Sequence, residues 1–519
     1  MRKDTGLGVG VDRQLGDRER VHVQVAQGRL RCDVGGVDPE SKEQGDERVV
    51  HGGAPLRGDC FVATAHGQPG NGAAAVPVTR AAQLRAPVGR LHRVSRCRMT
   101  PAAEGLPPLK ERGMTADIAV TGLGMVTPAG LDTQSTWRAV CDGRPTAATA
   151  DQLVGLPVDF CCSVPPFDAA QSLGRRTAYR LDRATQLVLM ATEEALHDAA
   201  LDSRTWDGAR VGVVIGGGLN GAQTWETQYQ RLRDSGPRHI SPLLIPMISP
   251  STPAGEVALA HQAHGPSLVT ATACASGATA VVVARDLLRS GQCDIVITGG
   301  TEASNTPLIA TGFAQLGALS TRCDDPAGAS RPFDRARDGF VMAEAAAVLI
   351  LERANEARAR GRKPRALLAG CGSTTDAHHP TAPHPYGRGA KQALRAALAE
   401  AALSHQDVAH VNSHGTSTLR GDAVEAEAIS TVLPSGPLVN STKGVLGHSM
   451  AAAGAVEAAL TVLSLQHSLV PPSANLDRPD PAFDLDFVTK VAAPRRLDAA
   501  LSNSFGFGGH NVVLAFRTP

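Results

Sequence analysis

Among the ten cysteines of the sequence, Cys274 has the neighbours that covalent catalysis needs. It lies in Thr-Ala-Cys-Ala-Ser-Gly at 272–277, between a β-prone segment at 267–270 and a helix predicted for 278–289. The small neighbours let the backbone turn sharply, and a helix N-terminus favours the thiolate through its dipole and free N–H groups. The position is therefore typical of a nucleophile. A free cysteine is also often a packed small hydrophobic residue, so the assignment depends on other residues.

Two histidines and a glycine-rich turn provide those other residues. His414 lies in Asn-Ser-His-Gly-Thr-Ser-Thr at the end of a predicted strand. His448 ends Lys-Gly-Val-Leu-Gly-His, directly before a helix predicted for 449–466. The turn Asn-Ser-Phe-Gly-Phe-Gly-Gly-His-Asn at 503–511 contains two aromatic residues. A lone histidine is more often structural than catalytic, so it is the combination of these motifs that predicts a reactive site.

The composition excludes several classes of protein. The formal net charge of +1 provides no field that would attract nucleic acid or an anionic membrane. The cysteines show neither CxxC pairs nor a His/Cys ligand pattern for a metal, which argues against a zinc site and a disulfide scaffold and favours a reducing cytoplasm. No apolar run reaches the ~18 residues of a membrane span. The 519 residues are enough for a large core in one to three domains.

Residues 1–113 differ from the rest of the chain. They contain no Ile, Trp or Tyr, and Phe61 is their only Phe. So few large apolar side chains hardly offset the entropy of ordering. Three interpretations remain open. The segment is a disordered extension, or an interaction tail around the arginines between Arg80 and Arg98, or an addition that comes from a start assigned upstream of the natural first residue, Met114. We favour the last.

From Met114 onward, apolar strands alternate with helices. We predict strands at 117–128, 210–218 and 293–300 and helices at 133–141 and 179–199. The Gly-Leu-Gly in the first strand lacks the spacing of a dinucleotide site, and we interpret it as a structural turn. The alternation indicates an α/β protein with largely parallel strand pairing.

A second half begins near Pro364 and resembles the first. It contains predicted strands at 366–372 and 408–414 and a helix at 389–402. The segment 438–463 repeats the pattern of 267–288: an apolar strand, a small-residue turn with a reactive group and an Ala/Val-rich helix. We therefore expect two pseudo-duplicated halves, 114–363 with the cysteine and 364–519 with the histidines, and a site between them.

The order and spacing of these motifs resemble the β-ketoacyl-acyl-carrier-protein synthases, the condensing enzymes of the thiolase superfamily. The resemblance runs from Asp117 to Arg517 and includes Arg-Pro-Phe-Asp-Arg-Ala-Arg-Asp-Gly-Phe-Val at 331–341. It is strongest to the elongating type of fatty-acid synthesis and to type II polyketide ketosynthases. It implies a thiolase-like five-layered α-β-α-β-α fold, an acyl carrier protein as partner, substrates carried on phosphopantetheine, and neither a metal nor another cofactor.

The resemblance also implies the reaction, a decarboxylative Claisen condensation. Cys274 takes the acyl chain from its carrier as a thioester. A malonyl-carrier then loses CO₂, and the resulting carbanion attacks the acyl-Cys carbonyl. Two imidazole N–H groups, from His414 and His448, are suited to hold the developing enolate oxygen, and one of them can transfer a proton.

Further residues are assigned by the same resemblance. The oxyanion of the acyl-Cys intermediate is expected to bind the N–H groups of Cys274 and Phe507. The remaining assignments are support for the histidines from Lys443, Glu425 and Asp422; a gate and aromatic wall from Phe505, Phe507 and Phe313; phosphopantetheine binding by Thr381, Thr416 and Thr418; acyl binding by Leu219; and carrier binding by Arg175, Arg176 and Arg180. A purely structural role stays open for Asp422, Glu425 and the threonines, and a solvated basic face stays open for the arginines.

The sequence departs from the family in two places. Ala-Glu-Ala-Ala-Ala at 343–347 replaces a glycine-rich segment, which puts the local packing in doubt. Gly317 stands where a basic residue is common at the carrier entrance. Leu219 leaves room for acyl chains beyond the shortest, but one methylene changes binding by only ~1–3 kcal/mol.

The expected assembly is a homodimer, and three alternatives remain open. The first is a polyketide ketosynthase that works with a homologous chain-length partner in a heterodimer. The second is a non-catalytic partner subunit, which Cys274 and both histidines disfavour. The third is a degradative thiolase, which needs a second catalytic cysteine near the C-terminus, where this chain has no cysteine after Cys371.

Overall fold

The computed structural model describes residues 22–24, 29–31 and 117–519. The chain divides into two compact units, residues 1–101 and 102–519, and each is described by itself. In the first unit, two short strands pair antiparallel, β1 (His22–Gln24) and β2 (Arg29–Arg31). The other residues of the predicted extension lie outside the described part of the chain, so the three interpretations of 1–113 stay predictions.

A single eleven-stranded sheet forms the framework of the second unit. Its strands are β3 (Ile118–Val126), β6 (Val211–Gly216), β7 (Ser267–Thr270), β8 (Ile295–Glu302), β9 (Ala345–Arg353), β10 (Ala366–Thr375), β11 (Val408–Asn412), β12 (Leu438–Asn440), β14 (Asp486–Phe487), β16 (Ala499–Gly506) and β17 (His510–Arg517). The spatial order is β7-β6-β8-β9-β3 in the N-terminal half and β12-β11-β16-β17-β10 in the C-terminal half, where the short β14 adds a further strand beyond β12. Because both halves place their strands in the same order, the structure confirms the predicted duplication.

The strand pairing is mixed, and the expectation of largely parallel pairing is wrong. β6 is parallel to β7 and β8, and β11 is parallel to β12 and β16. β14 is parallel to β12 at the other edge, and the remaining pairs within the two halves are antiparallel. β9 returns beside β8, and β17 returns beside β16, each in the direction opposite to its neighbour, which makes both pairs antiparallel. β3 and β10 also pair antiparallel and join the two halves.

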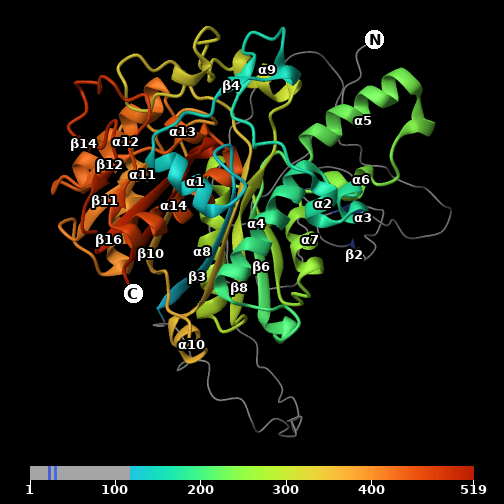
Figure 1. Cartoon of the computed structure of the whole chain (residues 1–519), viewed down its shortest axis with the longest axis horizontal. Coiled ribbons are helices and arrows are strands. Elements are labelled where there is room, and N and C mark those ends of the chain that lie inside the picture. Colours follow the sequence, from blue (N-terminus) through green and yellow to red (C-terminus); the bar gives the residue numbers. More distant parts are fainter. Residues whose placement is uncertain (1–21, 25–28, 32–116) are drawn as a thin grey trace, which may run out of the picture. The chain divides into compact units, whose positions relative to one another are not determined.

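Helices form three layers around the two halves of the sheet. α4 (Arg183–Ala199) and α7 (Thr252–Ala260) pack on the outer face of the N-terminal half. α11 (Arg388–Ala401) and α12 (Leu419–Val432) pack on the outer face of the C-terminal half. Between the halves lie α8 (Ser276–Arg289) and α14 (Ala453–His467). The arrangement, visible in Figure 1, is the predicted five-layered α-β-α-β-α fold.

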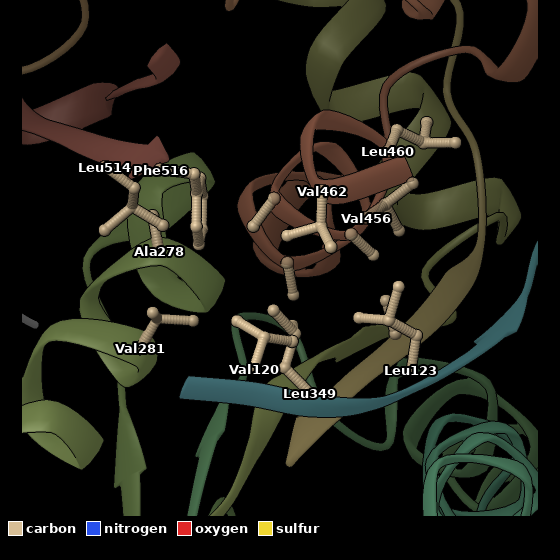
Figure 2. Packing of buried hydrophobic residues seen from close by; sticks show 14 of the residues in the cluster. Val120, Leu123, Ala278, Val281, Leu349, Val456, Leu460, Val462, Leu514 and Phe516 are labelled. Carbon is tan, nitrogen blue, oxygen red and sulfur yellow. The ribbon is translucent and has the colours of Figure 1, made fainter. Parts of the chain in front are cut away.

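The central layer contains the largest apolar cluster. Every residue of α14 from Ala453 to Leu465 is buried, as expected for a helix that packs on all sides. Figure 2 shows side chains of α8, α14 and the neighbouring strands meeting in this cluster; those labelled are Val120, Leu123, Ala278, Val281, Leu349, Val456, Leu460, Val462, Leu514 and Phe516. The starts of both central helices are thereby held within one rigid core.

The two central helices approach most closely at a pair of glycines near their N-termini. A Cβ atom on Gly277 would lie 2.8 Å from the backbone N of Ala455, and one on Gly454 would lie 2.7 Å from the backbone N of Ala278. No side chain fits at either position. The contact brings together the segments that precede the helices, which contain Cys274 in one half and His448 in the other.

The remaining elements surround this core, and two helices begin later than predicted. α4 begins at Arg183 because Asp182 caps it, and α14 begins at Ala453 after a 3₁₀ turn, Met450–Ala452. The other helices and strands are α1 (Thr133–Cys141), β4 (Ala148–Thr149), β5 (Phe160–Cys161), α2 (Ala169–Leu173), α3 (Arg175–Tyr179), α5 (Ala222–Ser235), α6 (Leu244–Ile248), α9 (Pro307–Gln315), α10 (Ala354–Ala359), α13 (Lys443–Leu446), β13 (Leu469–Val470) and β15 (Ala493–Pro494). Among the described residues, no helix combines the length and apolar character that a membrane span requires.

Candidate active site

Cys274 lies in a tight 3₁₀ turn, Ala273–Ala275, between β7 and α8. Ala273 has a φ of 50°, in the left-handed region that few non-glycine residues adopt. Ser276 holds the turn, because its Oγ accepts from Thr272 N at 2.9 Å and donates to Ala273 O at 2.6 Å. The backbone N–H of Phe507 faces the Cys274 sulfur. The turn therefore fixes the thiol at the point where the two halves meet.

His448 lies beside this thiol. Its Nε2 is 3.1 Å from Cys274 Sγ. The His448 N–H donates to Val341 O at 2.7 Å, directly after a left-handed Gly447 with a φ of 67°. The ring packs edge-on against Phe340 and His414, with centroids 5.3 Å away in both cases. Within the described part of the chain, Nδ1 of His448 has no hydrogen-bond partner, so no neighbour locks one tautomer.

His414 follows β11 and is fixed in one tautomer. Lys443 Nζ lies 3.4 Å from Nδ1 of His414 and donates to the His414 carbonyl at 2.6 Å. Because an ammonium group can only donate, Nδ1 accepts and the ring proton lies on Nε2. Glu425 holds the backbone by accepting from the N–H groups of His414 and Gly415 at 2.8 and 2.7 Å.

Burial determines the protonation of the three reactive groups. It raises the pKa of Cys274 to about 11, against the opposing effects of Lys443 and the Phe507 N–H. It lowers the pKa of His414 and of His448 well below the usual value, and Lys443 lowers both further. At neutral pH the site therefore contains a thiol and two neutral imidazoles. The expectation that the helix start favours a thiolate is wrong, because desolvation outweighs it.

The reactive atoms of Cys274, His414 and His448 all lie within 4.8 Å of one another. A thiolate and two imidazoles are also possible ligands for a soft cation. Binding such an ion would require the buried thiol to lose its proton, and the Lys443 ammonium next to His414 would repel it. The chemistry of the donor set therefore favours proton and acyl transfer over metal binding.

Two buried glutamates belong to the site although the sequence did not single them out. Glu457 forms a fully buried ion pair with Lys443, and burial, opposed by Lys443, raises its pKa to about 7. Glu302, at the end of β8, accepts from the Leu219 N–H at 3.1 Å, and burial raises its pKa to about 7. Glu457 is the only acidic residue of the Ala-, Val- and Leu-rich α14, and that contrast could have indicated a role for it.

A cavity of about 660 Å³ opens above these groups. Most of the predicted site residues line it: Cys274, His414, His448, Glu425, Phe313, Phe505, Phe507, Leu219, Thr381, Thr416 and Thr418. Lys443 and Asp422 lie beneath its wall. Asp422 is fully buried and accepts from the N–H groups of Phe333 and Ser417 at 2.8 and 3.1 Å, and burial raises its pKa to about 7.

Comparisons with known proteins give the family. The family model "Beta-ketoacyl synthase, N-terminal domain" matches residues 115–357, and "Beta-ketoacyl synthase, C-terminal domain" matches residues 365–477. The chain belongs to the β-ketoacyl synthase family.

Relatives and solved structures agree with this assignment. The 3-oxoacyl-[acyl-carrier-protein] synthase 2 of Synechocystis sp. is 42% identical over 405 residues, which cover 77% of this chain and 97% of the relative. A β-ketoacyl synthase structure from Burkholderia phymatum has a TM-score of 0.73 and 31% identity and covers 78% of this chain and 100% of its own. A type II polyketide ketosynthase, solved with its acyl-carrier protein and a hexaketide, has a TM-score of 0.72 and 31% identity and covers 78% and 99%. These likenesses confirm the predicted family, thiolase-like fold and condensing-enzyme class.

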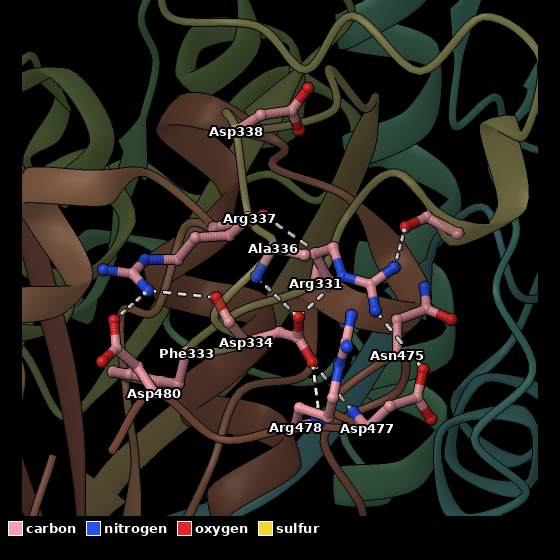
Figure 3. Close-up of polar contacts among 12 residues, drawn as sticks. Arg331, Phe333, Asp334, Ala336, Arg337, Asp338, Asn475, Asp477, Arg478 and Asp480 are labelled. Carbon is pink, nitrogen blue, oxygen red and sulfur yellow. Dashed lines mark hydrogen bonds and ion pairs between the residues drawn. The ribbon is translucent and has the colours of Figure 1, made fainter. Parts of the chain in front are cut away.

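In this β-ketoacyl synthase, the segment 331–341 supports the cavity wall. Arg331 Nε donates to Asp334 Oδ1 at 3.1 Å, and Arg337 Nη1 donates to Asp480 Oδ2 at 2.9 Å. Asp334 also accepts from two backbone N–H groups in the same distant loop as Asp480. Figure 3 shows these contacts around the buried Asp334. They attach the segment that carries Phe340, a lining residue of the cavity, to the C-terminal half.

The alanines that replace the family's glycines fit this synthase without disruption. Ala343 and Ala345–Ala347 are buried, and the last three begin β9. At Ala343 a neighbouring glycine provides the space, because a Cβ on Gly447 would lie 3.2 Å from the Ala343 Cβ. The doubt about local packing is therefore removed.

The three predicted carrier-binding arginines do not line the cavity. Arg175 and Arg176 are exposed on α3. Arg180 pairs with Glu256 of α7 through two contacts at 2.5 and 2.6 Å. Arg180 is therefore already neutralised within the chain, while its two neighbours are accessible.

Proposed function

We propose that the chain elongates an acyl group by decarboxylative Claisen condensation on Cys274. The observation that carries the proposal is the meeting of one thiol and two neutral imidazoles, within 4.8 Å of one another, at a cavity of about 660 Å³. The residues 114–363 provide the nucleophile, and the residues 364–519 provide both histidines.

In the first half-reaction, the Cys274 sulfur attacks the thioester carbonyl of an acyl-carrier. His448 Nε2, at 3.1 Å, accepts the thiol proton and returns it to the departing carrier thiolate. The N–H groups of Cys274 and Phe507 hold the intermediate oxyanion. In support, a Cβ on Gly506 would lie 3.1 Å from Cys274 N, so the Phe507 turn packs directly on the nucleophile turn.

In the second half-reaction, a malonyl-carrier loses CO₂ and its thioester oxygen becomes an enolate. His414 donates its fixed Nε2–H to this oxygen. After His448 has returned the thiol proton, its one ring proton lies on Nδ1, which has no hydrogen-bond partner among the described residues. That proton can therefore move to Nε2, and His448 then donates it to the same oxygen. The enolate carbon then attacks the acyl-Cys carbonyl, and the Cys274 sulfur leaves as a thiolate, which takes up a proton from solvent to restore the resting thiol. The β-ketoacyl product remains on the carrier.

The cavity wall supports an assignment of the two ends of the substrate. Leu219, held by Glu302, lines the acyl side, and Thr381, Thr416 and Thr418 line the side that we assign to the phosphopantetheine arm. We propose that the exposed Arg175 and Arg176 meet the acidic acyl carrier protein. A free catalytic thiol suits a reducing compartment, so we place the protein in the cytoplasm.

The test is acylation and decarboxylation by variants of Cys274, with Cys323→Ala as a control because Cys323 is exposed and does not line the cavity. Cys274→Ala should form no acyl adduct in intact-protein mass spectrometry, and Cys323→Ala should be acylated like the native protein. Cys274→Gln should retain malonyl-carrier decarboxylation, because a neutral amide mimics the acylated state. Stoichiometric acylation of Cys274→Ala would overturn the proposal.

We further propose a homodimer that forms through β7. This strand lies at the edge of the sheet, and Leu268 within it is 44% exposed. An apolar edge strand normally needs a partner, and pairing with its symmetry mate would join the sheets of two protomers. Light scattering at micromolar concentration should give a dimer, and Leu268→Lys should shift it toward monomer. An active monomer would contradict the homodimer, and activity only with a cysteine-less homologue would favour the polyketide heterodimer.

A further inference from the structure

One strong cation on the cavity wall has no role in the chemistry above. Among the described residues that line the cavity, Arg420 is the only arginine or lysine. It lies in the first turn of α12 and is exposed. Within the part of the chain that the structure covers, its guanidinium makes neither a hydrogen bond nor an ion pair.

The acidic groups on the same wall do not neutralise Arg420. Asp338 accepts from the N–H and hydroxyl of Thr321 at 3.0 and 3.3 Å. Asp376 accepts from the His384 N–H and from Asn511 Nδ2, both at 2.9 Å. Both contacts from Thr321 go to Oδ2 of Asp338, and its Oδ1 lies 4.0 Å from Arg322 Nε. Both oxygens of Asp376 accept hydrogen bonds from its own neighbours. Among the described residues, neither carboxylate pairs with Arg420.

The segment from His414 to Arg420 forms a track from the reactive centre to the surface. His414 is 7% exposed and Thr416 is 8% exposed. Thr418 is intermediate, and Arg420 is exposed. All four residues line the cavity. The hydroxyls of the two threonines are 3.0 Å apart, which makes one polar strip along the wall.

We propose that Arg420 binds the phosphate of the carrier's phosphopantetheine arm as the arm enters the cavity. The inference rests on the proposed function. A phosphopantetheine arm has a thioester at one end, neutral amides in the middle and a phosphate at the other end. The track presents imidazole, hydroxyls and guanidinium in that order. A guanidinium pairs with phosphate oxygens through two parallel N–H groups, which an amide side chain cannot reproduce.

The experiment compares two small thioesters that differ only in the phosphate: acyl-phosphopantetheine and acyl-pantetheine. The variants are Arg420→Gln and the matched control Arg388→Gln, an exposed arginine in the first turn of α11 that does not line the cavity. In the native protein, kcat/KM should be higher for the phosphorylated thioester. In Arg420→Gln this preference should fall about five- to tenfold, mostly through KM. Arg388→Gln should keep the native preference, and Arg420→Lys should keep part of it.

Further measurements separate this proposal from alternatives. Added salt should weaken the preference in the native protein, because the site is exposed. An equal loss of preference in both glutamine variants, or an unchanged preference in Arg420→Gln, would overturn the role of Arg420. If Arg420→Gln lowered kcat/KM for acyl-coenzyme A and left kcat/KM for acyl-phosphopantetheine unchanged, that result would assign Arg420 to the nucleotide phosphates of coenzyme A. It would also overturn the proposal. Acylation of Cys274 by acyl-pantetheine in the native protein tests the proposed function separately, because that substrate has no phosphate.

Discussion

At the scale of single residues, the two histidines beside Cys274 differ in what holds their protons. Lys443 fixes the tautomer of His414, whereas Nδ1 of His448 has no partner within the described residues. His414 is therefore a permanent donor, and His448 can accept in one half-reaction and donate in the other. The ion pair of Lys443 with the buried Glu457 keeps the ammonium in place below the His414 ring.

The first prediction concerns the reactivity of the resting thiol. Burial raises the pKa of Cys274 to about 11, so the thiolate is scarce at neutral pH. The rate of Cys274 alkylation by iodoacetamide should rise about tenfold per pH unit from pH 7 to 9, because only the thiolate reacts. The measurement is peptide mass spectrometry in a Cys323→Ala background. A plateau below pH 8 would instead indicate a thiolate–imidazolium pair with His448.

The second prediction concerns the carboxyl group of Glu302. Burial raises its pKa from 4.5 to about 7. A raised pKa means that its contribution to stability is present below about pH 4.5 and is lost as the pH rises through about 7. The unfolding free energy of Glu302→Gln relative to the native protein should therefore increase between pH 5 and pH 8, by at most about 3 kcal/mol.

Urea denaturation at the two pH values measures this difference. Asp484→Asn is the control, because Asp484 is exposed and its side chain makes no hydrogen bond or ion pair within the described residues. A difference between Glu302→Gln and the native protein that stays constant from pH 5 to 8 would contradict the prediction.

At the scale of elements, the contact between α8 and α14 determines the geometry of the site. Gly277→Ala would place a Cβ atom 2.8 Å from Ala455 N, so the helices would have to separate. We expect a loss of about 1–3 kcal/mol in stability. We also expect slower acylation of Cys274, because its turn directly precedes α8.

A matched glycine in another helix provides the control for this prediction. A Cβ on Gly255 of α7 would have nothing within 4 Å. Gly255→Ala should therefore stabilise the protein by about 0.4–1 kcal/mol. Denaturation curves and acylation rates of the two variants test both effects. Equal stability of Gly277→Ala and the native protein would mean that the central layer is looser than the structure indicates.

Much of this element structure follows from local sequence signals. The helix predicted for 133–141 is α1, and the β-prone segment at 267–270 is β7. Apolar runs and caps are local properties, so sequence alone can reveal them. The antiparallel return of β9 and β17 was not predictable in this way, because strand order depends on contacts between distant segments. The raised pKa of Cys274 was missed for the same reason, since burial is a property of the folded chain.

At the scale of the whole molecule, the fourth prediction concerns residues 1–113. The N-terminal family model begins to match at residue 115, and the Synechocystis relative aligns over 97% of its length with 77% of this chain. A protein that begins at Met114 should therefore retain the native oligomeric state, melting temperature and condensation rate. Light scattering, thermal denaturation and a malonyl-carrier assay measure these properties. Loss of folding or activity would show that 1–113 contributes to the synthase.

The shared strand order of the two halves also constrains the folding of the nascent chain. In each half, the last strand to leave the ribosome lies between the strand made just before it and the first strand of that half: β9 lies between β8 and β3, and β17 lies between β16 and β10. Until that strand is synthesised, its two neighbours present unpaired edges. Neither half can therefore complete its sheet progressively during translation, and a ribosome that pauses before β17 leaves an aggregation-prone intermediate for chaperones to shield.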